Sequence, residues 1–260
     1  MDLHSHLMPG VDDGAADLDQ SRAALERMHA NGVRALVTTP HLDASTSASP
    51  ERLAAALAAL DPAWEALRAM AAAEFPDLRL ERGVELMLDV PRPVVDDPRL
   101  RLAGTRFVLV EFPFLAVPPG GSNVLFEMRA AGWEPVLAHP ERYAGVDPTL
   151  SGPEEWRRVG ARLQVNWGSL LGRYGPGAQA VAWALLERGW ADYLSSDHHA
   201  RGRLGMADAR ALLLERGGEE PLRLLSEENP ARLLDGEPPL PVPPLPPRAR
   251  PLWKRLLRLR

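Results

Sequence analysis

Residues Val33–His41, VRALVTTPH, join an apolar run to a histidine that comes directly after it. Val33–Thr39 has the length and the β-branched content of a buried strand, and the helical stretch before it closes on Gly32. Similar units, a strand-like run followed by an imidazole, a carboxylate or an amide, recur along the chain. This recurrence predicts an α/β fold in which parallel strands alternate with helices.

Seven such strands are expected, with helices in most of the gaps between them. The expected strands are Asp2–His4, Val33–Thr39, Leu78–Glu85, Arg106–Phe112, Glu134–His139, Leu163–Asn166 and Asp192–Ser196. Capping and breaking residues mark the helices. The expected features are a helix over Asp17–Asn31, a second that Ser49 caps with Pro50 in first position, a break or kink of that helix at Pro62, and an amphipathic helix over Ala178–Arg188.

Two residue types that are absent or rare restrict the chemistry. The 260 residues contain no cysteine, which excludes thiolate nucleophiles, cysteine-ligated zinc and disulfides. Lys254 is the only lysine, so the body of the chain offers none for a Schiff base, a P-loop or a carbamylated metal bridge.

Charge is unevenly distributed along the sequence. Residues 247–260 carry a formal charge of +6 with no acidic residue, so the remaining residues carry −11 of the total of −5. An acidic body suits cations and repels polyanions, so a nucleic-acid partner is not expected. There is no apolar run long enough for a membrane span and no secretory signal, so a cytoplasmic protein is expected.

Polar side chains follow each expected strand. They are His4 and His6, His41, Glu85, Glu111, His139, Asn166, and Asp197 with His199. The carboxyl ends of parallel strands converge on one face, and the spacing i, i+2 lets both residues of a pair reach one ion. Donors without sulfur favour Mn, Fe, Co or Zn, and bridging carboxylates allow two or three ions to lie close together.

Taken alone, each of these residues has an ordinary structural explanation. An isolated HxH pair is weak support for a metal site, and ion pairing or capping is the commoner role of a lone glutamate. Their joint placement is stronger support for a metal site, because five of the seven histidines fall at expected strand ends. His29 fits a helix C-terminus instead, and His198 should point away from its neighbours.

Seven motifs carry a resemblance that runs nearly end to end. They are DLHSHLMPGVDDGA from Asp2, TTPH ending at His41, GVEL around Glu85, FVLVEFPF around Glu111, PVLAHPERY around His139, QVNWGSLLGRYG from Gln164 and SSDHH around Asp197. With these motifs the chain resembles the bacterial manganese-dependent tyrosine phosphatases of the PHP (polymerase and histidinol phosphatase) superfamily, which are associated with capsule and exopolysaccharide synthesis.

The resemblance implies a distorted seven-stranded (β/α) barrel with a three-metal centre. The implied ligands are His4, His6, Asp13, His41, Glu85, Glu111, His139, Asp197 and His199. Asp13 rather than Asp12 matches the family ligand, Glu85 resembles a bridging ligand, and Arg142 resembles the phosphate-binding arginine. A second arginine of the family corresponds to Arg203, or to Arg201 instead. The chain departs from the family after His41, where it continues Leu42, Asp43, Ala44.

The activity implied is hydrolysis of phosphotyrosine by a metal-activated hydroxide, with Mn²⁺ as the cofactor. The expected partner is a phosphotyrosine protein, in particular a membrane tyrosine kinase of polysaccharide export. Three alternatives stay open: another PHP phosphoesterase such as a histidinol-phosphate phosphatase, an amidohydrolase, and a non-catalytic regulatory module. The lack of a lysine in the body of the chain disfavours an amidohydrolase, and the complete ligand set disfavours a regulatory module.

The composition changes near residue 236. The expected domain is residues 1–236, and residues 237–260 are expected to form a proline-rich extended linker, Pro238–Pro247, followed by a basic tail. In that tail five apolar side chains interleave with the six basic ones. This pattern is compatible with a short amphipathic helix that makes peripheral contact with an anionic membrane, or with a solvated tail.

Overall fold

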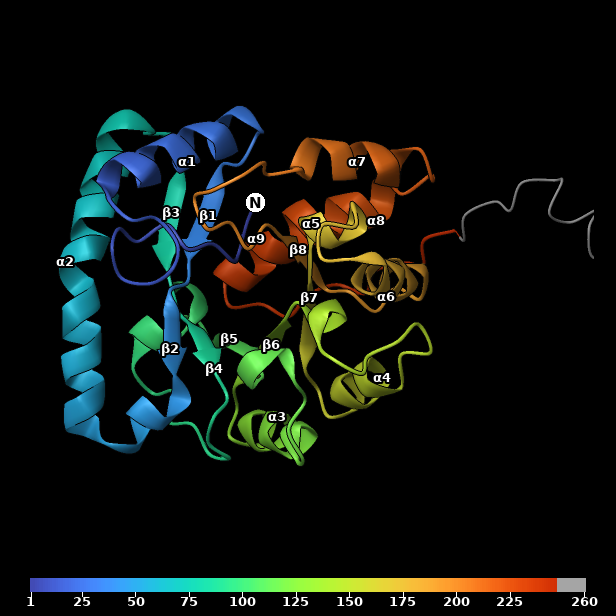
Figure 1. The fold of residues 1–260 in the computed structure, drawn as a ribbon, viewed down its shortest axis with the longest axis horizontal. Coiled ribbons are helices and arrows are strands. Elements are labelled where there is room, and N and C mark those ends of the chain that lie inside the picture. The colour runs from blue at the N-terminus through green and yellow to red at the C-terminus, as the bar shows by residue number, and fades with distance from the viewer. Residues whose placement is uncertain (247–260) are drawn as a thin grey trace, which may run out of the picture.

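The computed structural model describes residues 1–246, and the predictions for the basic tail lie outside them. Within this range the chain is an α/β structure in which helices surround parallel strands (Figure 1). A six-stranded sheet has the order β2–β4–β5–β6–β7–β8, and β1 pairs with β3 in a two-stranded sheet. The strands are β1 Ala35–Thr38, β2 His41–Asp43, β3 Arg79–Arg82, β4 Glu85–Met87, β5 Phe107–Glu111, β6 Glu134–Ala138, β7 Arg162–Asn166 and β8 Tyr193–Ser195.

Helices fill the connections between the strands. The α-helices are α1 Leu18–Ala30, α2 Pro50–Glu74, α3 Gly121–Ala130, α4 Ser151–Arg158, α5 Trp167–Leu170, α6 Pro176–Glu187, α7 Met206–Leu214, α8 Glu219–Arg223 and α9 Asn229–Leu234. A π-helical stretch, η6 Leu224–Glu228, separates α8 from α9. The 3-10 helices are η1 Ala44–Ala48, η2 Pro98–Leu100, η3 Leu102–Gly104, η4 Pro113–Leu115 and η5 Pro140–Arg142. No helix of residues 1–246 combines the length and the hydropathy that a membrane crossing requires.

Side chains cap the first two helices, and the cap predicted for Ser49 is confirmed. The Asp17 carboxylate accepts from the amide of Gln20 at the start of α1, and the Ser49 hydroxyl accepts from the amide of Arg52 at the start of α2. Of the two outcomes expected at Pro62, a break is excluded, because α2 continues through this residue to Glu74. Buried leucines on both sides of Pro62 hold the two halves of α2 against the core.

The expected first strand is not a regular strand. Asp2 forms an isolated parallel bridge with Leu36, and Ser5 forms one with His198. The amide of Asp2 donates to the carbonyl of Ala35 at 2.9 Å, and the amide of His6 donates to the carbonyl of His198, also at 2.9 Å. The first residues therefore lie between β1 and the loop that follows β8.

The strands expected over Val33–Thr39 and Leu78–Glu85 were placed correctly but each ends early. Pro40 separates β1 from β2, because proline has no amide proton to donate to a neighbouring strand. Pairing resumes beyond the interruption, where the amide of Glu85 donates to the carbonyl of Pro40 at 3.0 Å. His41 and Glu85 therefore begin β2 and β4 in register, side by side, instead of following the ends of long strands.

The core follows the two-residue period of the strands. Val108 and Val110 of β5 belong to a large buried cluster that includes the inner faces of the helices, whereas Phe107 and Leu109 belong to a second, smaller cluster. Leu3 is part of the second cluster, which anchors the N-terminal segment among the strands. Packing on both faces therefore fixes the strand ends from which the polar residues extend.

The proline-rich segment contains neither helix nor strand up to residue 246, yet it packs on the body. Val242 and Leu245 are buried, and the amide of Leu245 donates to the carbonyl of Leu186 at the end of α6. The segment thus completes the core between α6 and α8 instead of standing clear of it.

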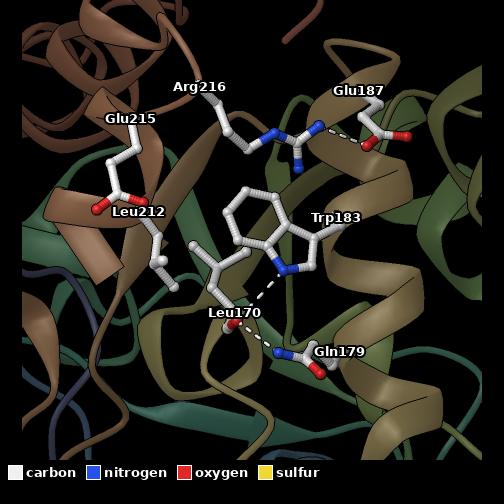
Figure 2. A pocket seen from close by; sticks show the side chains of 7 residues that line it. All are labelled: Leu170, Gln179, Trp183, Glu187, Leu212, Glu215 and Arg216. Carbon is white, nitrogen blue, oxygen red and sulfur yellow. Dashed lines mark hydrogen bonds and ion pairs between the residues drawn. The ribbon is translucent and has the colours of Figure 1, made fainter. Parts of the chain in front are cut away.

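Arg216 holds the last described residue of this segment. Its guanidinium donates to the carbonyl of Pro246 and to Glu187, both at 2.6 Å, and lies 4.5 Å from the centroid of the Trp183 ring. Figure 2 shows the guanidinium above the indole, at the edge of a cavity of about 260 Å³. No metal-ligand group of the described residues lies in this cavity, so it is separate from the histidine cluster.

Candidate metal centre

The histidines and carboxylates of the expected strand ends gather in one place. Among residues 1–246, three groups have ligand atoms that all lie within 4.8 Å of one another. They are His4, His6, Glu85 and Asp197; His41, Glu85 and Glu111; and His6, Asp13, His41 and His199. Three residues are shared between groups, so the groups form one continuous cluster.

The most buried group is built by the N-terminal segment together with β4 and the loop after β8. The Nε2 atoms of His4 and His6 lie 3.2 Å apart. Each of these atoms also lies 3.2–3.4 Å from Glu85 Oε2 and from Asp197 Oδ1. Two nitrogens and two oxygens therefore converge from four side chains on one point.

Glu85 links this group to the second. Its Oε2 lies 3.2 Å from His41 Nδ1 as well, while its Oε1 lies 2.9 Å from His139 Nε2. Glu111, the last residue of β5, lies 3.4 Å from His41 and 3.8 Å from His139. Because the two oxygens of Glu85 face different imidazoles, this carboxylate could contact two neighbouring ions if metal were bound.

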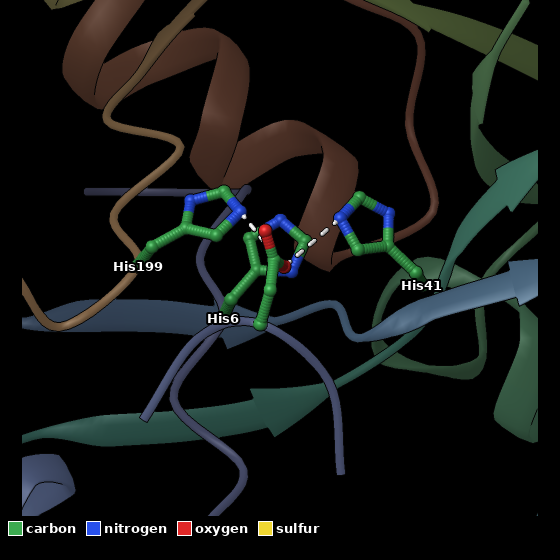
Figure 3. A group of neighbouring side chains, drawn as sticks. His6, His41 and His199 are labelled. Carbon is green, nitrogen blue, oxygen red and sulfur yellow. Dashed lines mark ion pairs between the residues drawn. The ribbon is translucent and has the colours of Figure 1, made fainter. Parts of the chain in front are cut away.

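The third group lies nearest to the solvent. His41 and His199 each place Nε2 near Asp13 Oδ1, at 3.4 and 3.3 Å. Figure 3 shows the rings of His41 and His199 on opposite sides of this group, with the ring of His6 between them. Asp13 thus joins the ligand candidates, as the resemblance predicted.

Three histidines are fixed in the tautomer that a ligand requires. His4 Nδ1 lies 2.8 Å from the Gln164 amide oxygen and His6 Nδ1 lies 2.8 Å from Asp12, while His199 Nδ1 lies 3.1 Å from the backbone carbonyl of Asp197. These oxygens only accept, so in the neutral form of each imidazole Nδ1 carries the proton and Nε2 presents a lone pair to the cluster. Gln164 and Asp12 therefore hold two of the candidate ligands, as outer partners commonly do in metal sites.

The electrostatics of the cluster are those of imidazoles surrounded by carboxylates. Burial opposes a charge on His4, but Glu85 and Asp197 outweigh it and raise its pKa to about 9. His4, followed by His139 and His6, holds the pKa of Glu85 well below its usual range despite burial. Buried carboxylates that stay ionised among imidazoles make a strongly cation-attracting site.

Backbone conformation places two of these residues. His139 follows β6 with φ of 37° and Asp197 follows β8 with φ of 51°, in the left-handed region that side chains other than glycine rarely adopt. Such strained residues concentrate at functional sites, where the surrounding structure holds them. The turn at His139 also begins η5, which presents Arg142 to the same pocket.

The donor set fits divalent metal ions. The paired Nε2 atoms of His4 and His6 cannot both carry a proton at 3.2 Å, because two N–H groups would then point at each other. A cation between these nitrogens and the two carboxylates satisfies all four donors. Nitrogen and carboxylate oxygen donors without sulfur suit Mn, Fe, Co and Zn.

Arg142 lies beside the cluster. Its Nη1 lies 2.6 Å from Asp197 Oδ2, and its guanidinium carbon lies 4.3 Å from the centroid of the Tyr174 ring. Tyr174 covers one face of the guanidinium and Asp197 orients one edge, which fixes the arginine and leaves other donors for a phosphate. Tyr174 lies in a motif quoted for the resemblance, but no pattern in the sequence indicated this contact.

The structure does not bring Arg203 to the site. Its side chain is 87% exposed and pairs with Asp208 of α7 at 3.3 Å. Arg201 instead donates to the backbone carbonyl of Asp13. Of the two arginines that the sequence left open, Arg201 contacts the loop of Asp13, whereas Arg203 lies beyond the turn that Ala200 and Gly202 make with positive φ.

The two histidines predicted to have structural roles lie outside the three groups. His29, in the last turn of α1, lies 2.8 Å from Asp77 at the surface. His198 is buried, and its Nε2 has no hydrogen-bond partner among residues 1–246. The position predicted for His29 at a helix C-terminus is confirmed.

The pocket over the cluster has a volume of about 290 Å³. Its lining residues are Asp13, His41, Glu85, Met87, Glu111, Phe114, Leu115, His139, Arg142, Asp197 and His199. Met87, Phe114 and Leu115 are apolar residues that sequence reasoning did not assign to the site. Phe114 lies within the FVLVEFPF motif, but its exposure follows from a turn that the motif does not reveal.

Known proteins resemble this chain over most of its length. The family model described as capsular polysaccharide synthesis, CpsB/CapC, matches residues 1–235. Tyrosine-protein phosphatase YwqE of Bacillus subtilis is 28% identical over 260 residues, which cover 97% of this chain and 98% of YwqE. Tyrosine-protein phosphatase CpsB of Streptococcus pneumoniae is 28% identical over 172 residues, which cover 64% of this chain and 67% of that protein.

A solved structure agrees with these sequence matches. It comes from a study of YwqE of Bacillus subtilis and CpsB of Streptococcus pneumoniae, described as unique metal-dependent tyrosine phosphatases. The superposition has a TM-score of 0.73 at 26% identity, and covers 95% of this chain and 99% of the other. With a family match that extends over residues 1–235, this chain belongs to the CpsB/CapC family of capsular polysaccharide synthesis proteins.

Proposed function

We propose that this chain is a metal-dependent protein tyrosine phosphatase. The observation that carries the proposal is the position of Arg142, a candidate phosphate ligand, in the same pocket as three adjoining groups of metal-ligand side chains. The relatives named as tyrosine-protein phosphatases support the choice of phosphotyrosine as substrate. The family's link to capsular polysaccharide synthesis supports a tyrosine kinase of capsule or exopolysaccharide synthesis as the physiological target.

Nine side chains would hold the metal ions: His4, His6, Asp13, His41, Glu85, Glu111, His139, Asp197 and His199. We propose three ions, because the ligand atoms form three groups, and Mn²⁺ in preference to Fe, Co or Zn. When bound, the ions supply Lewis acidity and a water of lowered pKa as the nucleophile.

The protein's own residues position the phosphate. Arg142 neutralises its non-bridging oxygens with the donors that Asp197 and Tyr174 leave free. Arg201, which already contacts the loop of Asp13, is the candidate for a second phosphate contact in preference to Arg203. The leaving phenolate of tyrosine has a pKa near 10, so it departs with less protonation than a serine alkoxide requires.

The proposal includes closure of the strands into a distorted seven-stranded (β/α) barrel. Its support is the N-terminal segment, which hydrogen bonds to β1 through Asp2 and to the loop after β8 through His6. Pairing between the β1–β2 and β3–β4 segments continues across Pro40 through the amide of Glu85. Closure would explain why side chains of the N-terminal segment and of the loop after β8 lie in one candidate ligand group.

A substrate comparison with metal analysis tests the function. The purified chain loaded with Mn²⁺ should release phosphate from a phosphotyrosine peptide, and EDTA should stop the reaction. Elemental analysis should detect bound metal, and His139→Ala should lower both turnover and metal content. Preferential hydrolysis of histidinol phosphate would instead indicate another phosphoesterase of the same superfamily, and metal binding without hydrolysis of either phosphate would indicate a regulatory module.

A further inference from the structure

Phe114 is an exposed aromatic side chain at the mouth of the metal pocket. Its side chain is 93% exposed, more than any other large apolar residue of the described range. It lines the same pocket as Glu111 and Arg142. Phe126, the next most exposed phenylalanine, is on α3 and lines no part of that pocket.

The backbone under this ring is strained. Phe114 has φ of 54° and ψ of 30°, and Leu115 follows with φ of 52°. A left-handed conformation costs a residue with a Cβ about 1–2 kcal/mol, and an exposed ring recovers nothing by burial. Two unfavourable features in one residue beside a candidate active site point to a contact that the free protein does not make.

Hydrogen bonds fasten the Phe114 turn to the loop that carries Arg142. The carbonyl of Leu115 accepts from the amide of Ala144 at 2.8 Å, and Ala116 forms a parallel bridge with Ala144. The Tyr143 hydroxyl accepts from the amide of Phe112 at 3.0 Å. The ring of Phe114 is therefore held on a loop tied to the phosphate-binding arginine.

We propose that Phe114 determines specificity by packing against the phenyl ring of the substrate's phosphotyrosine. The inference rests on the proposed function and names the group that recognises the aryl part of the same substrate. Arg142 binds the phosphate, and the substrate's ring, joined to that phosphate through one oxygen, lies at the pocket mouth where Phe114 stands. A phosphate on a serine has a short aliphatic stem and offers no ring for this contact.

Kinetics with a ring-bearing and a ring-free ligand test the contact. Phe114→Ala should raise KM for a phosphotyrosine peptide about three- to tenfold, the range expected for loss of one aromatic pair. Inorganic phosphate, which has no ring, should inhibit wild type and Phe114→Ala with the same Ki within about twofold. Phe114→Trp should keep the wild-type KM, because it restores an aromatic face, and Phe126→Ala should also leave KM unchanged.

Two results would overturn the inference. Either an unchanged KM for the peptide in Phe114→Ala, or an equal rise in KM and in the phosphate Ki, would show that the ring makes no specific contact. Wild-type turnover separates this outcome from failure of the proposed function. If the Mn²⁺-loaded wild-type protein does not hydrolyse the phosphotyrosine peptide, the proposed function and the inference about Phe114 are both wrong. If the wild type hydrolyses the peptide and Phe114→Ala has the same KM, only the inference about Phe114 is wrong.

Discussion

Arg142 Nη1 lies 2.6 Å from Asp197 Oδ2, so the guanidinium that lines the pocket is oriented by a carboxylate of the metal-ligand cluster. Lysine in its place keeps the charge but loses the planar set of donors. We expect Arg142→Lys to lower kcat/KM for a phosphotyrosine peptide about 10- to 100-fold, the cost of one or more hydrogen bonds to a charged group.

The metal content of this variant distinguishes two roles of Arg142, binding the phosphate and holding Asp197. Elemental analysis of Arg142→Lys should give the wild-type amount of metal, because the arginine contributes no ligand. Loss of metal together with activity would mean that Arg142 serves mainly to hold Asp197. Arg68→Lys, at an exposed position on α2 that pairs with Glu65, is the matched control and should not change activity.

Adjacent aspartates have different roles in the structure. Asp13 faces the imidazoles of His41 and His199, whereas Asp12 holds His6 Nδ1 and accepts from the amide of Gly14. We expect Asp13→Asn to lower the bound metal by about one ion per chain and Asp12→Asn to weaken affinity about 10- to 100-fold without changing the stoichiometry. Metal titration of the two proteins checks this, and the reverse pattern would assign the ligand to Asp12.

Sequence patterns located most of the site because strand ends converge wherever the strands are parallel. The spacing of His4 and His6 and the residues after the later strands were sufficient to predict one cluster. What the patterns could not predict was local conformation. His41 begins a strand because Pro40 interrupts the one before it, and no hydropathy pattern distinguishes these two situations.

Side-chain positions that depend on tertiary contacts could not be predicted from the sequence either. Gln164 belongs to a strand and reads as a polar residue of no special role until the fold places its amide oxygen 2.8 Å from His4. Arg201 and Arg203 are equivalent in composition and spacing, and only the turn at Ala200 and Gly202 separates them. Phe114 lies in an apolar motif, which does not indicate that its side chain is 93% exposed on a left-handed backbone.

His198 makes the stability of the protein depend on pH. Its imidazole is 3% exposed, and burial, followed by the positive charges of Arg27 and Arg173, lowers its pKa to about 4. In the unfolded chain the pKa is about 6.5. Between these values the unfolded chain binds a proton that the folded chain does not, so the free energy of unfolding falls as the pH is lowered from about 6.5 to 4.

Removing the imidazole should remove this part of the pH dependence. We expect wild type to lose about 2–3 kcal/mol more than His198→Leu when the pH is lowered from about 7 to 4.5. Urea unfolding of both proteins in EDTA at the two pH values measures the difference. The contributions of the other titrating groups to the pH dependence cancel, because both proteins share these groups. Equal losses would show that His198 is protonated in the folded state.

Phe114 should also reveal its strain in stability measurements. Glycine adopts φ of 54° without steric cost, but it loses more entropy on folding than other residues. We therefore expect Phe114→Gly to raise the free energy of unfolding by about 0.5–1 kcal/mol, since the ring it removes is 93% exposed. Phe114→Ala keeps the Cβ and should leave stability nearly unchanged.

The same substitution on a helix should have the opposite effect. Phe126 lies within α3, where glycine costs about 1 kcal/mol relative to alanine, so Phe126→Gly should lower the free energy of unfolding. Chemical denaturation of the three variants beside wild type measures these signs. Destabilisation by Phe114→Gly would mean that the ring packs in the free protein. Stabilisation by Phe114→Gly, together with a raised KM for the phosphotyrosine peptide, would show that the protein retains strain at the pocket mouth for substrate contact at the expense of stability.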